Sequence, residues 1–464
     1  MAKLNKHNKG ATSIESSRAS SLQLAVINQH TAGIDIGTTL MMVSYTDTQG
    51  NQCLFETDGF TQSLHALAQK LVDASVTDVA MEATGIYWMS LYEILEEYGL
   101  VVTLINPRHF KNVHAQKTDA KDCQWINQLH AHGLLRASHI APELYRELRS
   151  YLHERNRSQS QKGDTLNCIQ RTLSLMNLKV QHLLSDIEGV SGMAVLEAIA
   201  GGCKEPEALV ELIKLGRVKA SKEDLILSLS GYYKANYIAI LNQQLKTYKF
   251  HVEQMRDYEK YIEAVLKKML PEDEKGTQAS IPDKKTKIRK NQYAFNLSGY
   301  LKEILNVDTT EIPGFNEITT LSIIAVTGND MSKWKKAKYF TSWLNLSPIP
   351  SKSGGKLLGH LKRYTNNPAS QAFRLAAQSL WNHKGSLGVL YRRLSAQRGS
   401  SVAIKAVARK LAIIFYNMVK YGKAFDSSKI TADPTKQRDK KVANLKKQLA
   451  AYGYAIQPIV NTSL

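Results

Sequence analysis

The order of strand-like and helix-like segments in the first third of the chain constrains its fold most. Three short runs, at 31–37, 40–46 and 51–56, have the composition of strands and are separated by tight, glycine-containing connections. Helical spacing of apolar residues then alternates with two more strand-like runs, at 78–82 and 100–106, and helical patterns continue to residue 135. A strand meander followed by strand–helix crossovers predicts a mixed α/β sheet flanked by helices.

Length and composition limit the class of protein. At ~150 residues per domain, 464 residues favour two or three domains, and 43% hydrophobic with 22% charged residues is ordinary for globular proteins. No apolar run reaches the ~18 residues that a membrane-spanning helix needs, and the polar N-terminus lacks the apolar core of a secretory signal. Four scattered cysteines without a CxxC pair predict a reduced cytoplasmic chain without structural zinc or disulfides.

Charge is concentrated at the C-terminal end of the chain. Residues 331–464 hold 25 Lys and Arg against three Asp and no Glu, a net charge of +22, while the first 330 residues carry −2. Such an excess favours a C-terminal region that binds a polyanion over a basic face that serves only solubility. A membrane-surface role is disfavoured because the basic residues are spread over several segments and not gathered on one amphipathic helix.

The middle of the chain has the apolar spacing of paired helices. Two series of apolar residues have an average spacing of 3.5, which predicts a helical hairpin or a short dimeric coiled coil: Leu166, Ile169, Leu173, Met176, Val180 and Leu183, and Ile238, Leu241, Leu245, Tyr248, Val252 and Met255. The charged residues 271–291, with two prolines and no periodicity, predict a linker.

These patterns predict five consecutive parts: a flexible arm at 1–30, an α/β domain at 31–140, a helical coiled-coil region at 141–300, a mainly helical domain at 301–430 and a basic tail at 431–464. The Pro-Gly turn at 311–315 precedes an apolar helical run. It fits either a helix-hairpin-helix element, whose backbone amides hold a phosphate, or an ordinary connection between helices.

Four carboxylates in the α/β domain are candidates for chemistry. Asp35 lies inside an apolar strand and Glu82 ends another, positions that are costly unless the carboxylate is paired or binds a cation. Asp119 and Asp122 are three residues apart, on one face of a helix. Together they offer oxygen donors for Mg²⁺ or Mn²⁺, which in phosphoryl transfer orient the attacking oxygen and stabilise the leaving one. The alternatives are a strand-end turn at Asp35 and a helix cap with a surface charge at Asp119 and Asp122.

Residues 35–39, Asp-Ile-Gly-Thr-Thr, also resemble the first phosphate loop of actin-like sugar kinases and ATPases. That fold needs a later Asp-Gly-Gly loop and an adenosine-binding glycine pair, and the sequence contains neither. It also gives no reason for the basic C-terminal region.

A second candidate site is the Ser-Lys-Ser-Gly-Gly-Lys segment at 351–356. Ser351 or Ser353 could project its hydroxyl from a glycine turn beside two lysines that attract a phosphate, although the same composition suits a flexible loop and the sequence identifies no base to activate a serine. We expect a set of basic residues to contact nucleic-acid phosphates: Lys352, Lys356, Lys362, Arg363, Arg374, Arg392, Arg393, Lys405, Arg409 and Lys410.

Several motifs resemble a known family. They are Asn106–Asn112, Lys117–Ile126 with its Lys-Thr-Asp-Ala-Lys-Asp block, and His132–Arg136, then Ile312–Gly314, Leu346–Pro348, Ser353–Lys356 and Asn444–Tyr454. In this order they resemble the DEDD transposases of bacterial insertion sequences, a family that includes Piv-type DNA invertases and bridge-RNA-guided recombinases. The similarity covers most of residues 31–460. The strand order is likewise that of the ribonuclease-H/RuvC-like fold.

The resemblance implies a RuvC-like domain in which Asp35, Glu82, Asp119 and Asp122 bind a divalent metal. It implies a coiled coil that supports dimers pairing into a tetramer, and a C-terminal domain whose serine, here Ser353, attacks DNA and forms a 5′-phosphoserine. An RNA encoded by the element would pair with donor and target DNA, so base pairing would carry specificity. We therefore expect a cytoplasmic, nucleoid-associated protein.

The chain departs from the family pattern in three places. It has extra length around 187–300, Ile349 where the family usually has Arg, and Asn366-Asn367-Pro368 where the family has a glycine-containing turn. Two other functions remain open. A RuvC-like junction resolvase or nuclease would use metal-activated water and leave the serine idle, and a non-enzymatic nucleic-acid scaffold would need neither site.

Overall fold

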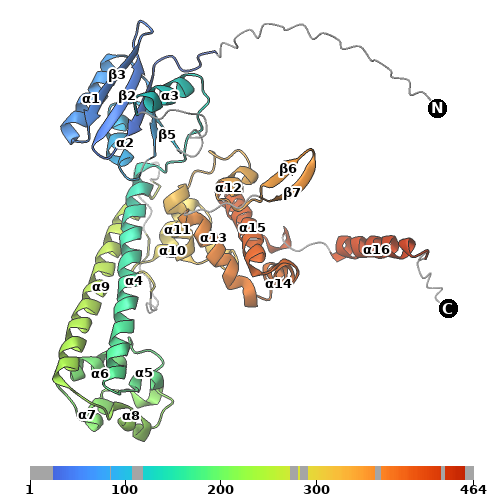
Figure 1. Ribbon diagram of the computed structural model, residues 1–464. Helices are drawn as coiled ribbons and strands as arrows, with labels where there is room; N and C mark the ends of the chain where they lie inside the picture. Colours follow the sequence, from blue (N-terminus) through green and yellow to red (C-terminus); the bar gives the residue numbers. More distant parts are fainter. Residues whose placement is uncertain are drawn as a thin grey trace, which may run out of the picture. The chain divides into compact units, whose positions relative to one another are not determined.

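The computed structural model describes residues 25–83, 85–106, 119–271, 281–282, 291–360, 367–429 and 434–454 (Figure 1). The chain divides into two compact units, residues 1–140 and residues 141–464. Most of the expected N-terminal arm and of the 271–291 linker lie outside the described residues.

The first unit is built on a five-stranded mixed sheet in the order β3-β2-β1-β4-β5. The first three strands form an antiparallel meander, and β4 and β5 run parallel to β1. The expected mixed α/β sheet is confirmed, with strands at β1 (Thr31–Ile36), β2 (Leu40–Thr46), β3 (Gln52–Asp58), β4 (Asp78–Glu82) and β5 (Val101–Ile105).

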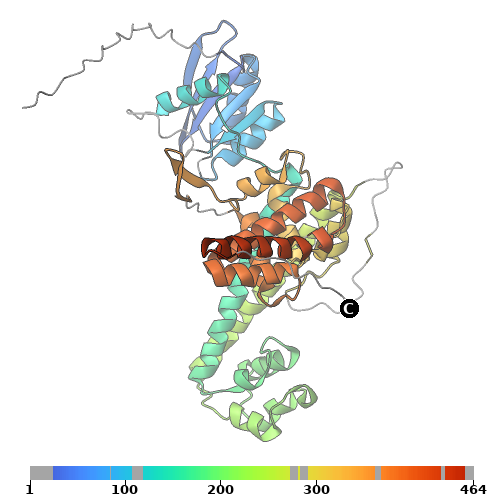
Figure 2. The same cartoon turned by 90° about the vertical axis from the view of Figure 1, so that its right-hand side faces the viewer.

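Helices cover both faces of this sheet (Figure 2). On one face, α1 (Thr61–Asp73) and α2 (Trp88–Glu97) pack their leucines against Ala32, Ile34 and Ile36 of β1. The opposite face of β1 is covered by α3 (Asp119–Ala131). Because residues of a strand point alternately to the two faces, Thr31, Gly33 and Asp35 share the face under α3.

The segment before β1 is bound to the end of α3. The backbone N–H groups of Ile27 and Asn28 donate to the carbonyl of Ala131, over 2.8 Å and 3.0 Å, and the Asn28 amide donates to the carbonyl of His130. The flexible arm expected to reach residue 30 is therefore fixed from Ile27 onward, because these donors find partners at a helix C-terminus.

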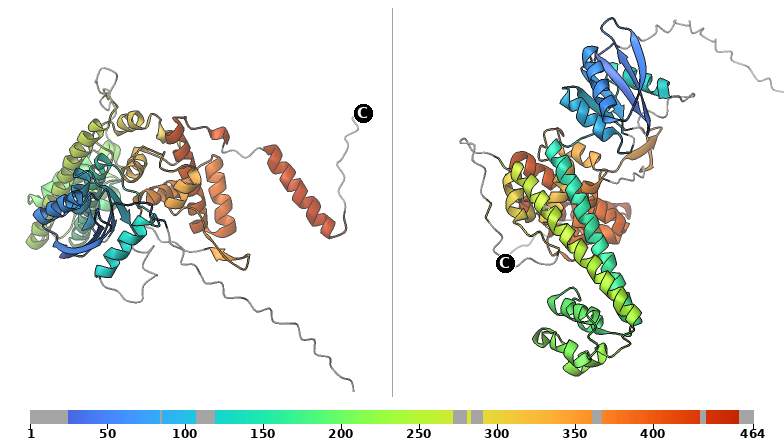
Figure 3. Two further views of the ribbon diagram at one scale, coloured as in Figure 1. Left: turned by 90° about the horizontal axis from the view of Figure 1, so that it is seen from above. Right: turned by 90° about the vertical axis from the view of Figure 1, so that its left-hand side faces the viewer.

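The second unit begins with a long helical hairpin. Helices α4 (Glu143–Leu175) and α9 (Ala235–Lys268) lie side by side along their length (Figure 3). Of the two expected arrangements, a helical hairpin or a dimeric coiled coil, the structure shows a helical hairpin within one chain. The first apolar series does not stay in one helix, because α4 ends at Leu175 and Asn177 adopts a left-handed conformation with φ of 59°.

Four short helices close the far end of the hairpin, and we call them the cap: α5 (Val180–Leu183), α6 (Val190–Ala200), α7 (Pro206–Glu211) and α8 (Lys222–Leu229). Their buried side chains form one core with Ile169 and Leu173 of α4 and Leu241 and Leu245 of α9. Most of the cap lies within residues 187–300, the stretch that was expected to be longer than in the family.

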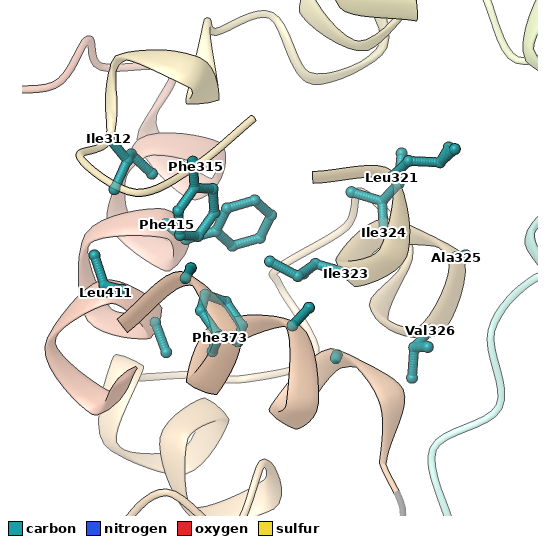
Figure 4. Packing of buried hydrophobic residues seen from close by; sticks show 14 of the residues in the cluster. Ile312, Phe315, Leu321, Ile323, Ile324, Ala325, Val326, Phe373, Leu411 and Phe415 are labelled. Carbon is teal, nitrogen blue, oxygen red and sulfur yellow. The ribbon is translucent and has the colours of Figure 1, made fainter. Parts of the chain in front are cut away.

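The rest of the second unit is mainly helical, as expected. Its helices are α10 (Leu297–Leu305), α11 (Glu317–Thr327), α12 (Ala337–Trp343), α13 (Pro368–Ser379), α14 (Ser386–Arg398), α15 (Ser400–Tyr421) and α16 (Pro434–Ala451). Phe315, Phe373 and Phe415 converge between α11, α13 and α15 (Figure 4), with ring centroids 5.7–6.1 Å apart. None of the helices within the described parts of the chain is both long and apolar enough to span a membrane.

The Pro-Gly turn joins α10 to α11 and packs against the core. Gly314 has a φ of 85°, and a Cβ there would lie 2.6 Å from the carbonyl oxygen of Ala376 on α13. At the start of α11, the Asn316 side chain already accepts the N–H of Thr319. This packing fixes the turn against α13.

One short β-hairpin interrupts the helices. Strands β6 (Pro350–Ser353) and β7 (Lys356–His360) pair antiparallel (Figure 1). The sequence did not predict these strands, because their stability depends on pairing across the turn and the segment has no alternation of buried residues.

A buried ion pair joins the two long helices. The Arg155 guanidinium, 1% exposed, donates through Nη2 to Oε1 of Glu259 over 2.8 Å and lies 4.4 Å from the ring centroid of Tyr293. The second oxygen of Glu259 accepts the backbone N–H of Ala294 over 3.2 Å. The pair thus also holds the segment that leads into α10.

We expect Arg155→Met to lower the free energy of unfolding by about 3–5 kcal/mol, because it leaves the Glu259 carboxylate buried without its counter-ion. The double variant Arg155→Met/Glu259→Leu should recover much of this loss, and urea unfolding monitored by circular dichroism measures both. The exposed Lys260–Asp257 pair has the same 2.8 Å separation, so Lys260→Met is a matched control with little expected change. Equal losses in the two single variants would contradict the prediction.

Candidate functional site

The sheet register brings two of the four carboxylates together. In the parallel pairing of β1 with β4, Ile34 lies opposite Met81, so the next residues, Asp35 and Glu82, occupy adjacent positions on neighbouring strands. Glu82 shares its face with Ala80, which packs against Ile126 of α3. Asp35 is half-buried and Glu82 is 6% exposed. Both carboxylates therefore lie at the end of the central strands, on the face that α3 covers.

Gly33 allows α3 to lie directly on β1. A Cβ at this position would lie 2.4 Å from both the backbone nitrogen of Asn127 and the carbonyl oxygen of Cys123. Two residues earlier, the Thr31 hydroxyl donates to Oδ1 of Asn127 over 2.7 Å. The backbones of the strand and the helix are thus in contact, and this contact fixes the distance of the helix from the carboxylate face.

The third carboxylate comes from α3 itself. Asp122 is half-buried and precedes Cys123, whose thiol is buried against the sheet. Burial is the main cause that raises the pKa of Cys123 to about 12; backbone hydrogen bonds from Gln124 and Cys123 oppose the rise, and the negative charges of Asp35 and Asp122 add to it. Asp35 on the strand and Asp122 on the helix therefore both lie close enough to the Cys123 thiol to raise its pKa.

The described side chains do not form a complete set of metal ligands. Among them, no three His, Cys, Asp or Glu side chains are grouped closely enough to hold an ion. Asp119 begins α3, but its side chain and residues 107–118 lie outside the described part. The donor chemistry nevertheless fits a hard divalent cation, because Asp35 and Glu82 are adjacent and Asp122 comes from the helix above them.

Ser353 lies at the tip of the β6–β7 hairpin. It pairs with Lys356 across Gly354 and Gly355, whose φ values of 53° and 77° are both positive. A two-residue turn of this kind fits the right-handed twist of the strands, and glycine adopts it without strain. Ser353 and its neighbours are exposed, and a Cβ on either glycine would meet nothing within 4 Å. The turn presents the Ser353 hydroxyl on a defined backbone.

The expected basic residues differ in their surroundings. Lys352, Lys356, Arg393 and Lys405 are exposed, Arg374, Arg392, Arg409 and Lys410 are half-buried, and Lys362 and Arg363 lie outside the described residues. Nη1 of Arg392 donates to the carbonyls of Trp381 and His383 over 2.8 Å and 2.9 Å. It therefore joins α14 to the turn before it. Within the described residues, the buried Nε atoms of Arg374 and Arg409 have no hydrogen-bond partner.

A second basic surface was not among the expected residues. Residues 333–339, which we call the strap, expose four lysines beside Tyr339: Lys333, Lys335, Lys336 and Lys338. The strap is held by the buried Trp334, whose carbonyl accepts from the hydroxyl of Tyr416 and from Nζ of Lys420. In the sequence, the run Lys-Trp-Lys-Lys-Ala-Lys could have indicated this surface, because it places one aromatic residue among four lysines.

The Asn-Asn-Pro departure has a local structural role. Oδ1 of Asn367 accepts the N–H groups of Ala369 and Ser370 over 2.9 Å and 3.2 Å, and Pro368 is the first residue of α13. Asparagine before a proline at the first helical position is a favoured helix start. Asn366 lies outside the described residues, and Ile349 is half-buried just before β6.

The first unit, with its meander, parallel crossovers and carboxylates on adjacent central strands, belongs to the ribonuclease-H/RuvC-like class. Residues 32–177 match a family model for a DEDD-type IS110 transposase, and residues 309–392 match the Transposase IS116/IS110/IS902 family. No curated protein matches the sequence. The chain belongs to the DEDD-type IS110 family of transposases. Proteins of this family bind DNA and cleave and transfer its strands, and domains of this type typically use divalent metal ions.

We expect Gly33→Ala to lower the free energy of unfolding by about 1–3 kcal/mol, because the new methyl group overlaps the α3 backbone. Hydrogen exchange should increase in α3 more than in α1. Gly163→Ala, in α4, is the matched control because a Cβ there meets nothing within 4 Å, and it should leave the chain as stable or slightly more stable. Unchanged exchange in α3 would mean that the helix is not held at this contact.

Proposed function

We propose that this transposase is a metal-dependent serine recombinase that mobilises its own insertion sequence under the guidance of an element-encoded RNA. The observation that carries the proposal is the hairpin turn at Ser353, where an exposed hydroxyl lies between two lysines within the stretch that matches a transposase family. A serine in this setting can approach a phosphodiester without displacing other protein groups.

The proposed step is a transesterification at a DNA phosphate. Oγ of Ser353 bonds to phosphorus as its proton passes to a base, and the bond from phosphorus to the 3′-oxygen breaks as that oxygen takes up a proton. The products are a 5′-phosphoserine and a free 3′-hydroxyl, and attack by the 3′-hydroxyl of another strand reverses the step and releases the serine. A covalent intermediate conserves the energy of the phosphodiester bond, so rejoining requires no nucleotide cofactor.

We assign the metal to the carboxylates under α3. Asp35, Glu82, Asp119 and Asp122 would hold Mg²⁺ or Mn²⁺, which would neutralise phosphate charge and orient the reacting oxygens. Asp35 and Glu82 support this assignment because they are adjacent on neighbouring strands, and Asp122 because it acts with Asp35 on Cys123. Strand cleavage would need both this carboxylate set and Ser353.

We propose DNA, a guide RNA and further copies of the chain as partners. The exposed lysines of the hairpin and the strap would contact phosphates of DNA or of the guide RNA. Specificity would come from base pairing, since lysine contacts to phosphates carry little sequence information. We also propose that the α4–α9 hairpin supports dimers that pair into a tetramer.

We expect Ser353→Ala to abolish covalent protein–DNA adducts and to leave DNA binding unchanged, because the variant lacks only the attacking oxygen. The assay uses the full chain purified with RNA transcribed from the element's flank, Mg²⁺ and end-labelled DNA, with adducts resolved on denaturing gels. Ser351→Ala is the matched control, two residues away on the same strand, and should retain adducts. Asp35→Asn should lose adducts at every Mg²⁺ concentration.

Two outcomes would contradict this mechanism. Adducts that persist in Ser353→Ala but disappear in Ser351→Ala would move the nucleophile to Ser351. Cleavage that yields free 5′-phosphate ends without any adduct would indicate metal-activated water and a junction resolvase or nuclease.

We expect replacement of the strap lysines Lys333, Lys335, Lys336 and Lys338 by Gln to weaken nucleic-acid binding and to flatten its salt dependence. Each lost phosphate contact should reduce the slope of log K against log salt by ~0.9 for duplex DNA and ~0.7 for a single strand. The control replaces four exposed lysines of the cap region, Lys204, Lys214, Lys219 and Lys222, with Gln. An equal change in both variants would reflect net charge alone and would exclude the strap as a binding surface.

A further inference from the structure

The β6–β7 hairpin exposes two leucines beside Ser353. Leu357 is 59% exposed and Leu358 is 70% exposed. The strand register shifts at this point: Ser351 pairs with Gly359, whereas Lys352 pairs with Leu357. Leu358 is therefore the extra residue of a β-bulge, and both leucines lie opposite Lys352.

The two faces of this ribbon carry different chemistry. Ser353 and Lys356 form the pair next to the turn, and Lys352 and Leu357 form the next pair. Since successive pairs of a two-stranded ribbon point to opposite faces, the serine and the apolar residues lie back to back. One face offers a hydroxyl and a cation, and the other offers two adjacent leucines with a cation at their edge.

Water is an unfavourable environment for this second face. A two-stranded hairpin is marginally stable on its own and normally needs a packed apolar face, yet these leucines are exposed. Adjacent exposed apolar residues with a polar rim mark an interaction site more often than single exposed apolar residues do. The hairpin is therefore expected to gain stability from a partner that covers the leucines.

Charge indicates what that partner is. The hairpin contains Lys352 and Lys356 and no carboxylate, and residues 331–464 contain no Glu at all. A partner that fits both leucines and lysines has an apolar interior bordered by closely spaced negative charges. Duplex DNA has this arrangement, since stacked bases lie between two rows of phosphates, and proteins that kink DNA insert leucine and similar side chains between base steps.

We propose that Leu357 and Leu358 form a wedge that enters the base stack of duplex DNA on one face of the hairpin, while Ser353 meets the strand that is cleaved on the opposite face and Lys352 and Lys356 bind the flanking phosphates. This inference rests on the proposed function, because it takes DNA at the Ser353 hairpin as the substrate. Its consequence is that the hairpin unstacks and bends the duplex at the cleavage site. The wedge would thus position the strand for the reaction without taking part in bond breaking.

The test measures base stacking directly. Duplex DNA carrying the end of the element, with 2-aminopurine at single positions across the cleavage site, is bound by the full chain with its flank RNA in a Ser353→Ala background. We expect a several-fold rise in 2-aminopurine fluorescence at one or two positions. Leu357→Ala/Leu358→Ala should abolish the rise, and Leu357→Met/Leu358→Met, which keeps an apolar side chain of similar size, should retain it.

The control is Leu212→Ala/Leu227→Ala, a pair of leucines that are also exposed, at 42% and 72%, and it should leave the fluorescence rise intact. An unchanged rise in the Leu357/Leu358 alanine variant would overturn the proposal. So would a change of oligomeric state in light scattering without any change in fluorescence, because the leucines would then bind a second copy of the chain. Since the assay reads stacking and not cleavage, its result holds whichever residue proves to be the nucleophile.

Discussion

The first unit depends on the contact between the backbones of β1 and α3 at Gly33. There a side chain as small as a methyl group would overlap both the nitrogen of Asn127 and the carbonyl of Cys123. Because the helix lies this close, Asp122 comes near the sheet face that already carries Asp35 and Glu82 at adjacent positions. The hydrogen bond from the Thr31 hydroxyl to Asn127 holds the same strand and helix together. One missing Cβ therefore sets the spacing on which the carboxylate site depends.

The second unit is organised by a polar contact. The Arg155–Glu259 pair joins α4 to α9 and also accepts the backbone of Ala294, so it connects the long hairpin to the segment that enters the helical core. A pair of apolar residues could pack there, but it would offer no acceptor for this N–H. The ion pair thus fixes how α4, α9 and the segment at Ala294 align with one another. A buried ion pair can have this role even when it adds little net stability.

The sequence predicted the elements that arise from local periodicity and failed where structure depends on partners distant in sequence. The five strands and three helices of the first unit follow from alternation, leucine spacing and glycine turns. The end of α4 could not be predicted in this way, because Met176 continues the apolar spacing although the chain turns at Asn177. The β6–β7 hairpin depends on cross-strand pairing and a bulge, and the strap depends on hydrogen bonds from Tyr416 and Lys420 to the Trp334 carbonyl. Of the candidate site, sequence could supply Asp35, Glu82, Asp119, Asp122 and Ser353 as residues, but not the register that makes the first two neighbours.

The cap has a core of its own, formed with the far ends of α4 and α9, and the buried residues of α10 to α15 belong to a different core. The long hairpin can therefore change length by whole heptads, about two turns at a time, without opening either core, because each added heptad extends only the seam between its two helices. Relatives with shorter or longer hairpins could evolve by small insertions and deletions in phase with the helix, and a protein engineer could graft a different small domain where the cap now lies.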